Sequence, residues 1–338
     1  MSEKKKVTTQ GITDWLRQFE GRVINIRDIM HGLNISPTQE GTFRVLLSRL
    51  AKQKEVIKPS GERDGNYQVL KRVKPVRWMD ADETSYFDLS FPRSHTDESS
   101  FCLENLISIS PGDLIIIAGV SNTGKSALAL NFLAENMDKY PCVLMGNEYT
   151  SMGNAPSPKF KRRLLNMNWA NWLNENGESK FELWPIRDNF EDYVQKDKIN
   201  LIDWVNLDDE FWKIGHITEE IKDAVGGGVA IVVLQKSRSK EQAVGGDFSE
   251  RMADAYLTVD PYGNWESRLT IGRVKAPKCH ATGRSWAFKI VDGGANLHEI
   301  REVERCWKCH GKGYALHGEC PECAGKGYRT KSQVDLPK

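Results

Sequence analysis

The stretch GVSNTGKSALALN, residues 119–131, decides the fold of the largest part of this chain. It matches Gly-x-x-x-x-Gly-Lys-Ser, the pattern of a phosphate-binding loop. The apolar run LIIIAGV leads into it, and KSALALNFLAENM follows as a helix. A strand, a glycine-rich loop and a helix in this order let backbone N–H groups at the helix N-terminus hold phosphate oxygens. The sequence therefore predicts a nucleotide site here.

Two side chains of the loop have predicted roles. Lys125 would reach the β- and γ-phosphates, and the Ser126 hydroxyl would ligate Mg²⁺. The residues expected to surround the phosphates are Gly119, Val120, Ser121, Asn122, Thr123, Gly124, Lys125 and Ser126.

Three further apolar strands end in polar residues. PCVLMGN is followed by Glu148, KINLID ends in Asp203, and VAIVVLQ ends in Gln235. Ligands of an α/β sheet gather at the carboxyl ends of its strands. Asp203 suits the second magnesium-holding role, Glu148 a general base, and Gln235 a sensor of the γ-phosphate. The alternative for each residue is a polar side chain that faces solvent at a strand end.

The core of residues 101–300 resembles the RecA/DnaB family of ATPases, and its hexameric-helicase branch in particular. The motifs that carry the resemblance occur in order and are SNTGKSALALN, VLMGNEYTS, INLIDWVNL, VAIVVLQKSR and GGDFSERMADAYLTVD. The resemblance implies an α/β RecA-like fold and ATP hydrolysis, with Glu148 as the catalytic glutamate and Asp203 as the Walker B aspartate. It also implies a homo-oligomeric ring or filament that acts on single-stranded DNA.

A later stretch, LTIGRVKAPKCHATGRSWAFKI, resembles the Lys-x-Arg-x-Gly hairpin of that branch. The hairpin carries positive charge to the ATP of the neighbouring subunit. Here the order is Arg273-Val274-Lys275, so Arg273 and Lys275 are both candidates for this role.

Two basic stretches suit nucleic acid. KSRSKEQAVGGDFSE sits where the family has its channel-lining loop, and Lys236, Arg238 and Lys240 are expected to follow a single-strand backbone. The second stretch, SPKFKRRLL, contributes Lys159, Lys161, Arg162 and Arg163. A solvated helix face explains this second stretch equally well.

Residues 9–75 have the pattern of a winged helix-turn-helix, with helices near 12–19 and 26–31 and a third opened by Ser36 and Pro37. Thr38, Arg44 and Arg49 would lie on the exposed face of the third helix, which can enter a major groove. Residues 1–78 carry 16 Lys and Arg against eight Asp and Glu, which favours a polyanionic partner. Duplex DNA and a docked protein are both compatible with this module.

The cysteines at the C-terminal end form C-x2-C-x10-C-x2-C, from Cys306, Cys309, Cys320 and Cys323. Four thiolates on two tight turns can surround Zn²⁺ tetrahedrally, and a closed cysteine shell indicates a structural role. CWKCHGKGY and CPECAGKGY also resemble the zinc domain of DnaJ-type chaperones. The predicted knuckle spans 305–328, and a disordered tail follows at 329–338. The scattered Cys102, Cys142 and Cys279 are expected to be small buried hydrophobes.

Composition sets the remaining limits. The chain has 338 residues, 39% of them hydrophobic and 28% charged, which is ordinary for a globular protein of two or three domains. An acidic, serine-rich stretch at 79–100 is expected to be a linker. No run is long and apolar enough for a membrane helix, and MSEKKKVTTQ lacks the apolar part of a signal peptide, so we expect a reducing cytoplasm.

These features together predict an ATPase that acts on single-stranded DNA as a helicase-like motor in replication or recombination, with ATP, Mg²⁺ and Zn²⁺ as cofactors. The alternative is an ATP-switched adaptor, such as a helicase loader or regulator, that binds DNA or replication proteins without moving along DNA.

Overall fold

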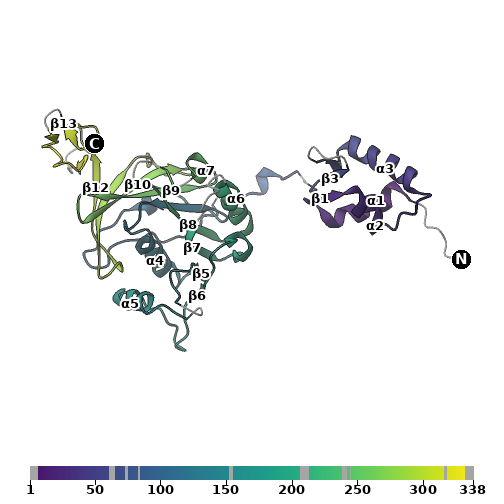
Figure 1. Ribbon diagram of the computed structural model, residues 1–338. Helices are drawn as coiled ribbons and strands as arrows, with labels where there is room; N and C mark the ends of the chain where they lie inside the picture. Colours follow the sequence, from purple (N-terminus) through teal and green to yellow (C-terminus); the bar gives the residue numbers. More distant parts are fainter. Residues whose placement is uncertain are drawn as a thin grey trace. The chain divides into compact units, whose positions relative to one another are not determined.

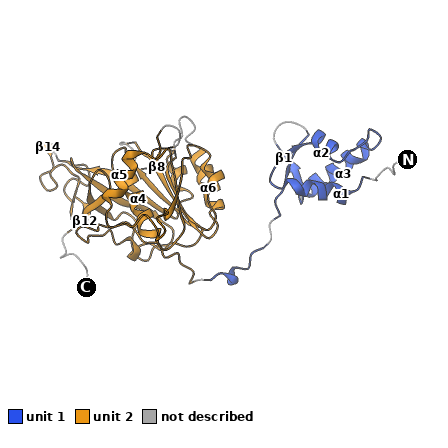
Figure 2. Cartoon of the chain, turned by 90° about the horizontal axis from the view of Figure 1, so that it is seen from below, with its two compact units in different colours: residues 1–82 blue, residues 83–338 orange. Residues whose placement is uncertain are grey.

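A computed structural model describes residues 7–60, 65–72, 75–82, 84–151, 155–205, 213–237, 242–243, 245–315 and 318–331. The chain divides into two compact units, Met1–Asp82 and Glu83–Lys338 (Figures 1 and 2). Each unit has its own buried core and is described by itself below.

The first unit is built from three α-helices and a three-stranded antiparallel sheet in the order β1-β3-β2. Its elements are α1 (Thr9–Leu16), the 3-10 helix η1 (Arg17–Phe19), β1 (Val23–Asn25), α2 (Ile26–Gly32), α3 (Glu40–Gln53), β2 (Ile57–Pro59) and β3 (Asn66–Val69). Phe43 and Leu47 of α3 pack with Ile12 and Leu16 of α1 in one apolar core. The 3-10 helix η2 (Trp78–Asp80) follows the last strand.

Helix α3 begins three residues later than its sequence indicates. Ser36 and Gln39 do make contact, because the Gln39 Oε1 accepts bonds from the Ser36 hydroxyl at 2.8 Å and from the Ser36 N–H at 3.2 Å. These bonds close a turn, and the helix proper starts at Glu40. Strand β1, which the sequence analysis did not predict, is only three residues long.

The second unit is organised around a ten-stranded sheet in the order β15-β12-β11-β10-β9-β4-β8-β7-β5-β6. The strands β6, β5, β7, β8, β4 and β9 run parallel, and β10, β11, β12 and β15 continue the sheet antiparallel. The α/β class predicted for the core is therefore confirmed.

The strands of this unit are β4 (Leu114–Gly119), β5 (Cys142–Met145), β6 (Phe181–Trp184), β7 (Ile199–Val205), β8 (Val229–Gln235), β9 (Ala255–Tyr262), β10 (Glu266–Val274), β11 (Ser285–Val291), β12 (Asn296–Arg305), β13 (Tyr314–Ala315), β14 (Gly318–Glu319) and β15 (Tyr328–Thr330). Its helices are α4 (Lys125–Asn136), α5 (Pro158–Asn166), α6 (Ile214–Ala224), α7 (Asp247–Glu250) and the 3-10 helices η3 (Leu103–Asn105) and η5 (Phe190–Tyr193).

The parallel part of the sheet is covered on both faces, which explains its continuous apolar strands. Successive side chains of a strand point to opposite faces. In β4, Ile115 and Ile117 accordingly join the core beneath α4, whereas Leu114 and Ile116 join the core that includes Ile221 of α6. Figure 2 shows α4 and α6 on opposite sides of β8.

The helices of both units are short. The longest helix described above, α3, has 14 residues, and α4 has 12. Across the described ranges, no helix combines the length and the apolar character that a membrane crossing needs.

The stretch at 79–100, expected to be a linker, is divided between the two units, because the first unit ends at Asp82 and the second begins at Glu83. Leu89 and Phe91 are buried in the core of the second unit, and Phe87 packs against it. The Asn136 side chain exchanges two 2.8 Å hydrogen bonds with the backbone of Ser90. The compact unit therefore takes in much of this stretch, because apolar residues alternate with its acidic and hydroxyl residues.

Candidate nucleotide site

The loop between β4 and α4 has the backbone that its glycines permit. Gly124 adopts φ +93°, and a Cβ at this position would clash with Ile290. The Thr123 hydroxyl lies 2.8 Å from the Val120 carbonyl and 3.2 Å from the Val259 carbonyl, so it ties the loop to β9. The loop is thus held at the carboxyl end of β4, directly before the N-terminus of α4.

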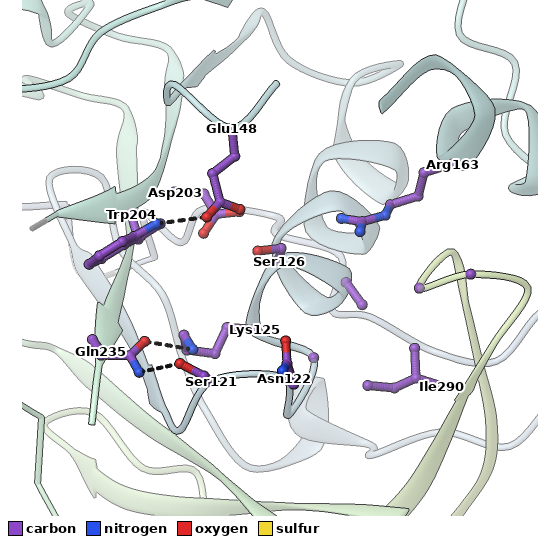
Figure 3. A pocket seen from close by; sticks show the side chains of 14 residues that line it. Ser121, Asn122, Lys125, Ser126, Glu148, Arg163, Asp203, Trp204, Gln235 and Ile290 are labelled. Atoms are coloured by element: carbon purple, nitrogen blue, oxygen red, sulfur yellow. Dashed lines mark hydrogen bonds between the residues drawn. The ribbon is translucent and has the colours of Figure 1, made fainter. Parts of the chain in front are cut away.

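A cavity of about 600 Å³ opens at this loop (Figure 3). It brings together eight residues that the sequence predicts for one site: Ser121, Asn122, Gly124, Lys125, Ser126, Glu148, Asp203 and Gln235. The cavity is lined by Ser121, Asn122, Gly124, Lys125, Ser126, Ala127, Glu148, Arg163, Asp203, Trp204, Gln235, Ile290, Gly293 and Gly294.

Lys125 is buried and rests on neutral acceptors. Its Nζ donates to the Val120 carbonyl at 2.9 Å and to Gln235 Oε1 at 3.2 Å. Gln235 Nε2 in turn donates to the Ser121 hydroxyl at 2.7 Å. Burial lowers the pKa of Lys125, although the charges of nearby Asp203 and Glu148 raise it in part. Among the described residues no carboxylate lies within 4.0 Å of this ammonium, so a phosphate oxygen can replace its present partners.

Asp203 of β7 is 1% exposed and only half satisfied. One carboxylate oxygen accepts a bond from the Tyr149 hydroxyl, and the other has no partner in the described part of the chain. Burial dominates and holds the pKa of Asp203 above its usual value, although the Tyr149 hydrogen bond and the nearby Ser126 hydroxyl lower it in part. A buried carboxylate oxygen without a partner beside a serine hydroxyl is a donor set that suits Mg²⁺. Asp203 and Ser126 therefore fit the metal that the loop implies.

Glu148 lies at the same cavity, after the end of β5. Its Oε1 accepts a hydrogen bond from the Trp204 indole at 3.0 Å, and its carboxylate is exposed. Tyr149 is buried, its hydroxyl donates to Asp203, and its ring packs at a tilt against the Phe160 ring of α5. The sequence analysis gave neither Tyr149 nor Trp204 a role, and the one available signal was that each directly follows a predicted site residue.

Arg273 and Lys275 do not reach this cavity. In the sheet register Arg273 of β10 lies opposite Tyr256 of β9, and Tyr256 lies opposite Ile116 of β4. Arg273 and the nearby Lys275 are therefore level with the amino half of β4, whereas the cavity opens at its carboxyl end. The Lys275 Nζ is 3.0 Å from an Asp254 carboxylate oxygen, and an Arg273 guanidinium nitrogen donates to the Glu250 carbonyl at 3.3 Å. If either cation contacts ATP, the ATP must therefore be bound to another subunit.

Lys236 differs from its expected place on a DNA-following loop. Its side chain is 4% exposed, and its Nζ lies 2.5 Å from Asp260 Oδ1. The cause is local, because the Lys236 N–H continues the β8 pairing to the Gly119 carbonyl at 2.9 Å and turns the side chain inward. The other two residues proposed for this loop, Arg238 and Lys240, lie outside the described residues.

The candidate DNA contacts of the first unit are at its surface. Thr38, Arg44 and Arg49 are all exposed, with Thr38 in the turn before α3 and the two arginines on the helix. Arg44 makes an ion pair with Glu40 at 2.8 Å, one turn earlier. Such an exposed pair is weak, so it can open for a phosphate.

The four predicted metal ligands converge in the last module. The sulfurs of Cys306, Cys309, Cys320 and Cys323 all lie within 4.8 Å of one another and all four residues are buried. The Gly313 N–H points to Cys309 Sγ at 3.4 Å, and the Gly327 N–H points to Cys323 Sγ at 3.2 Å. Such N–H···S bonds support metal-bound thiolates, so the cluster fits a metal ion.

The scattered cysteines follow their prediction only in part. Cys142 is buried, where burial raises its pKa to about 12. Cys102 and Cys279 are exposed, so the expectation of burial is wrong for these two.

No family model matches this chain, and no curated protein matches it. Solved structures with partial similarity to this chain are found. A KaiC-like protein, PH0186, from the hyperthermophilic archaeon Pyrococcus horikoshii OT3 is 15% identical with a TM-score of 0.45, over 63% of this chain and 99% of that one. The RadB recombinase is 16% identical with a TM-score of 0.41, over 57% of this chain and 92% of that one. Both scores are too low to carry an argument, so function has to be argued from the site.

Proposed function

We propose that this chain hydrolyses ATP and couples the hydrolysis to single-stranded DNA, as a motor with a RecA-like core. The observation that carries the proposal is the convergence of Lys125, Asp203 and Glu148 on one cavity, at the end of the sheet where its parallel strands finish. Lys125 and Asp203 are buried, so the arrangement is not a cluster of solvated surface charges.

The site has the parts that phosphoryl transfer to water needs. Lys125 and the loop N–H groups would hold the phosphates in place of the carbonyl and amide that Lys125 now contacts. Ser126 and Asp203 would hold Mg²⁺, which supplies positive charge to the transferring phosphoryl group. The Tyr149 hydroxyl, through its hydrogen bond to one Asp203 oxygen, would keep the other oxygen oriented toward the Mg²⁺.

Glu148 would activate the attacking water. Its carboxylate is exposed in the cavity and is fixed by the Trp204 indole N–H at 3.0 Å. A held carboxylate within reach of a bound water is the geometry of a general base. Because the indole binds one oxygen, the other remains available to accept the proton.

Gln235 would link the nucleotide to DNA. It bonds both Lys125 and Ser121, and it is the last residue of β8 before the segment that contains Arg238 and Lys240. A change at the γ-phosphate would move Gln235 and hence this segment. The basic residues after β8 are the proposed contacts to single-stranded DNA.

The remaining modules would serve the same activity. The first unit, proposed to be a winged helix, would use Thr38, Arg44 and Arg49 to hold DNA or a replication protein. The cysteine knuckle would bind one structural Zn²⁺. Arg273 or Lys275 would complete the ATP site of a neighbouring subunit in a homo-oligomeric ring or filament.

The test is ATP turnover by the purified chain with and without single-stranded DNA, with the oligomeric state measured under both conditions. Lys125→Ala serves as the control for contaminating ATPases. We expect assembly and a many-fold stimulation by DNA. A chain that stays monomeric and hydrolyses at the same rate with DNA would favour the adaptor alternative, an ATP-switched loader or regulator.

A further inference from the structure

A second cation of this chain lies at the proposed ATP site. Arg163 of α5 lines the same cavity as Lys125 and Ser126, although its sequence neighbours suggested a basic helix face. In Figure 3 its guanidinium points from α5 toward Ser126, on the side of the cavity away from Gln235. The preceding residue, Arg162, is exposed, whereas Arg163 is half-buried.

Helix α5 is fastened in a way that fixes this position. At its C-terminal end the Asn166 side chain donates to the Asp292 carbonyl at 2.8 Å, and the Asn296 side chain donates to the Asn166 carbonyl at 3.0 Å. At its other end, the Phe160 ring packs 4.7 Å from the Tyr149 ring, beside Asp203. The helix therefore bridges the turn between β11 and β12 and the residues that surround the predicted magnesium.

The Arg163 side chain itself packs against that turn. A Cβ on Gly294 would lie 3.3 Å from Arg163 Nε, so the glycine leaves room for the guanidinium in the cavity. Within the described ranges, no carboxylate lies within 4.0 Å of this guanidinium. By contrast, Arg268 and Lys236, which line the neighbouring cavity, both pair with Asp260. A fixed guanidinium without a counter-ion in a cavity indicates an anionic ligand.

We propose that Arg163 binds the α-phosphate end of the nucleotide, within its own subunit. This proposal rests on the proposed function. Lys125 reaches the β- and γ-phosphates, and Gln235 lies beside it, so these two residues mark one end of the phosphate chain. From there the phosphate chain of the nucleotide would run past Ser126 and Ala127, toward the side of the cavity from which Arg163 enters. Arg163 is thus a residue that binds ADP and ATP alike.

The experiment measures the affinity of fluorescent ADP and of a fluorescent non-hydrolysable ATP analogue for four forms of the full chain. These are the wild type, Arg163→Ala, Arg163→Lys and Arg162→Ala. Arg163→Ala should weaken both nucleotides by about 10- to 100-fold, the usual range for one charged hydrogen-bonding group. Arg163→Lys should lie between, since it keeps the charge without the planar fork. Arg162→Ala should bind as the wild type does.

Two further readings separate this role from others. Thermal unfolding without nucleotide should be the same for Arg163→Ala and Arg162→Ala, while ADP should raise the melting temperature of Arg163→Ala less. Mixing Arg163→Ala with Lys125→Ala should restore no activity, because both residues act in one subunit's site.

Three outcomes would overturn the proposal. One is a loss confined to the ATP analogue, which would place Arg163 at the γ-phosphate. Another is unchanged nucleotide affinity with weakened binding of single-stranded DNA, which would return Arg163 to a basic DNA face. The third is an equal loss in Arg162→Ala. If instead the wild type binds no nucleotide at all, it is the proposed function that fails.

Discussion

Two lysines at the amino end of the central sheet and two cations in the cavity at its carboxyl end are in opposite situations. At the amino end, Asp254 takes ion pairs from both Lys222 and Lys275, and its carboxylate also accepts the Leu114 N–H at 2.8 Å. At the carboxyl end, Lys125 rests on neutral acceptors and Arg163 has no carboxylate beside it in the described part of the chain. Charges that are neutralised internally hold the fold together, whereas these two unneutralised cations face a cavity.

The comparison is tested most severely by Lys125→Ala. The ammonium has no internal counter-ion to stabilise, so its loss should leave the unfolded fraction unchanged and abolish ATP binding. Equilibrium binding of a fluorescent ATP analogue, with melting temperature as the fold control, measures both. The matched control is Lys139→Ala, which removes a surface lysine paired with Asp88 and should bind normally. Normal ATP affinity in Lys125→Ala would show that the cavity is not the nucleotide site.

The next effect separates Arg273 from Lys275. Arg273 is exposed and bonds one backbone carbonyl, whereas Lys275 pairs with Asp254. We therefore expect Arg273→Ala to keep ATP binding and lower turnover by roughly a thousandfold or more, the usual effect of a cation supplied across an interface. Lys275→Ala should mainly lower stability.

Mixing identifies the subunit on which Arg273 acts. Arg273→Ala subunits retain an intact loop, and Lys125→Ala subunits retain the cation, so a mixture should recover part of the turnover. Recovery with Lys275→Ala but none with Arg273→Ala would assign the role to Lys275 instead.

The cysteine module shows the same lack of counter-charge in another form. Four buried sulfurs face one another, and a bound metal would supply the positive charge that four thiolates need. We expect one zinc per chain, and its removal by a chelator should unfold residues 305–328 as seen by hydrogen exchange. Cys306→Ser should lose the zinc, and Cys102→Ser, an exposed cysteine elsewhere, should keep it. Purified protein without zinc would defeat this prediction.

The smallest effect concerns the amino end. Burial raises the pKa of Asp254, but hydrogen bonds from Lys222, the Leu114 N–H and Lys275 outweigh it and hold the pKa below its usual value. The folded state therefore favours the ionised carboxylate, and this stabilisation is complete above the unfolded pKa of about 3.9 and is lost as the pH falls further.

Asp254→Asn should accordingly lower the free energy of unfolding by about 1–3 kcal/mol at pH 7. The difference from wild type should narrow below about pH 4. Denaturant unfolding at several pH values measures this, with the exposed Asp188→Asn as control. A difference that stays constant down to pH 2 would show that the ion pairs are not its source.

The sequence predicted the parts of the site that local patterns encode. Lys125 and Ser126 follow from one short motif, and Glu148, Asp203 and Gln235 follow from their places at strand ends. It named Arg163 only as part of a basic stretch and did not place it at the nucleotide site, because the contact between α5 and the turn at Gly294 joins segments more than 100 residues apart. The inward turn of Lys236 was also missed, since it depends on pairing with Gly119 rather than on composition.

The fold shows the same limit. The apolar strands and the helix after the loop could be predicted from the sequence. The burial of Leu89 and Phe91 could not, because they lie in a stretch whose overall composition is acidic. Alternating apolar residues outweigh composition when a core is available to receive them.

The central claim is that the carboxyl end of the sheet hydrolyses ATP with Glu148 as the base. The most direct measurement is single-turnover phosphate release from pre-bound ATP, in wild type and in Glu148→Gln, with DNA present. We predict that both bind ATP with similar affinity, that the wild type releases phosphate, and that Glu148→Gln releases almost none. Equal release by the two proteins would remove Glu148 from this role, and a wild type that binds ATP without ever releasing phosphate would contradict the claim altogether.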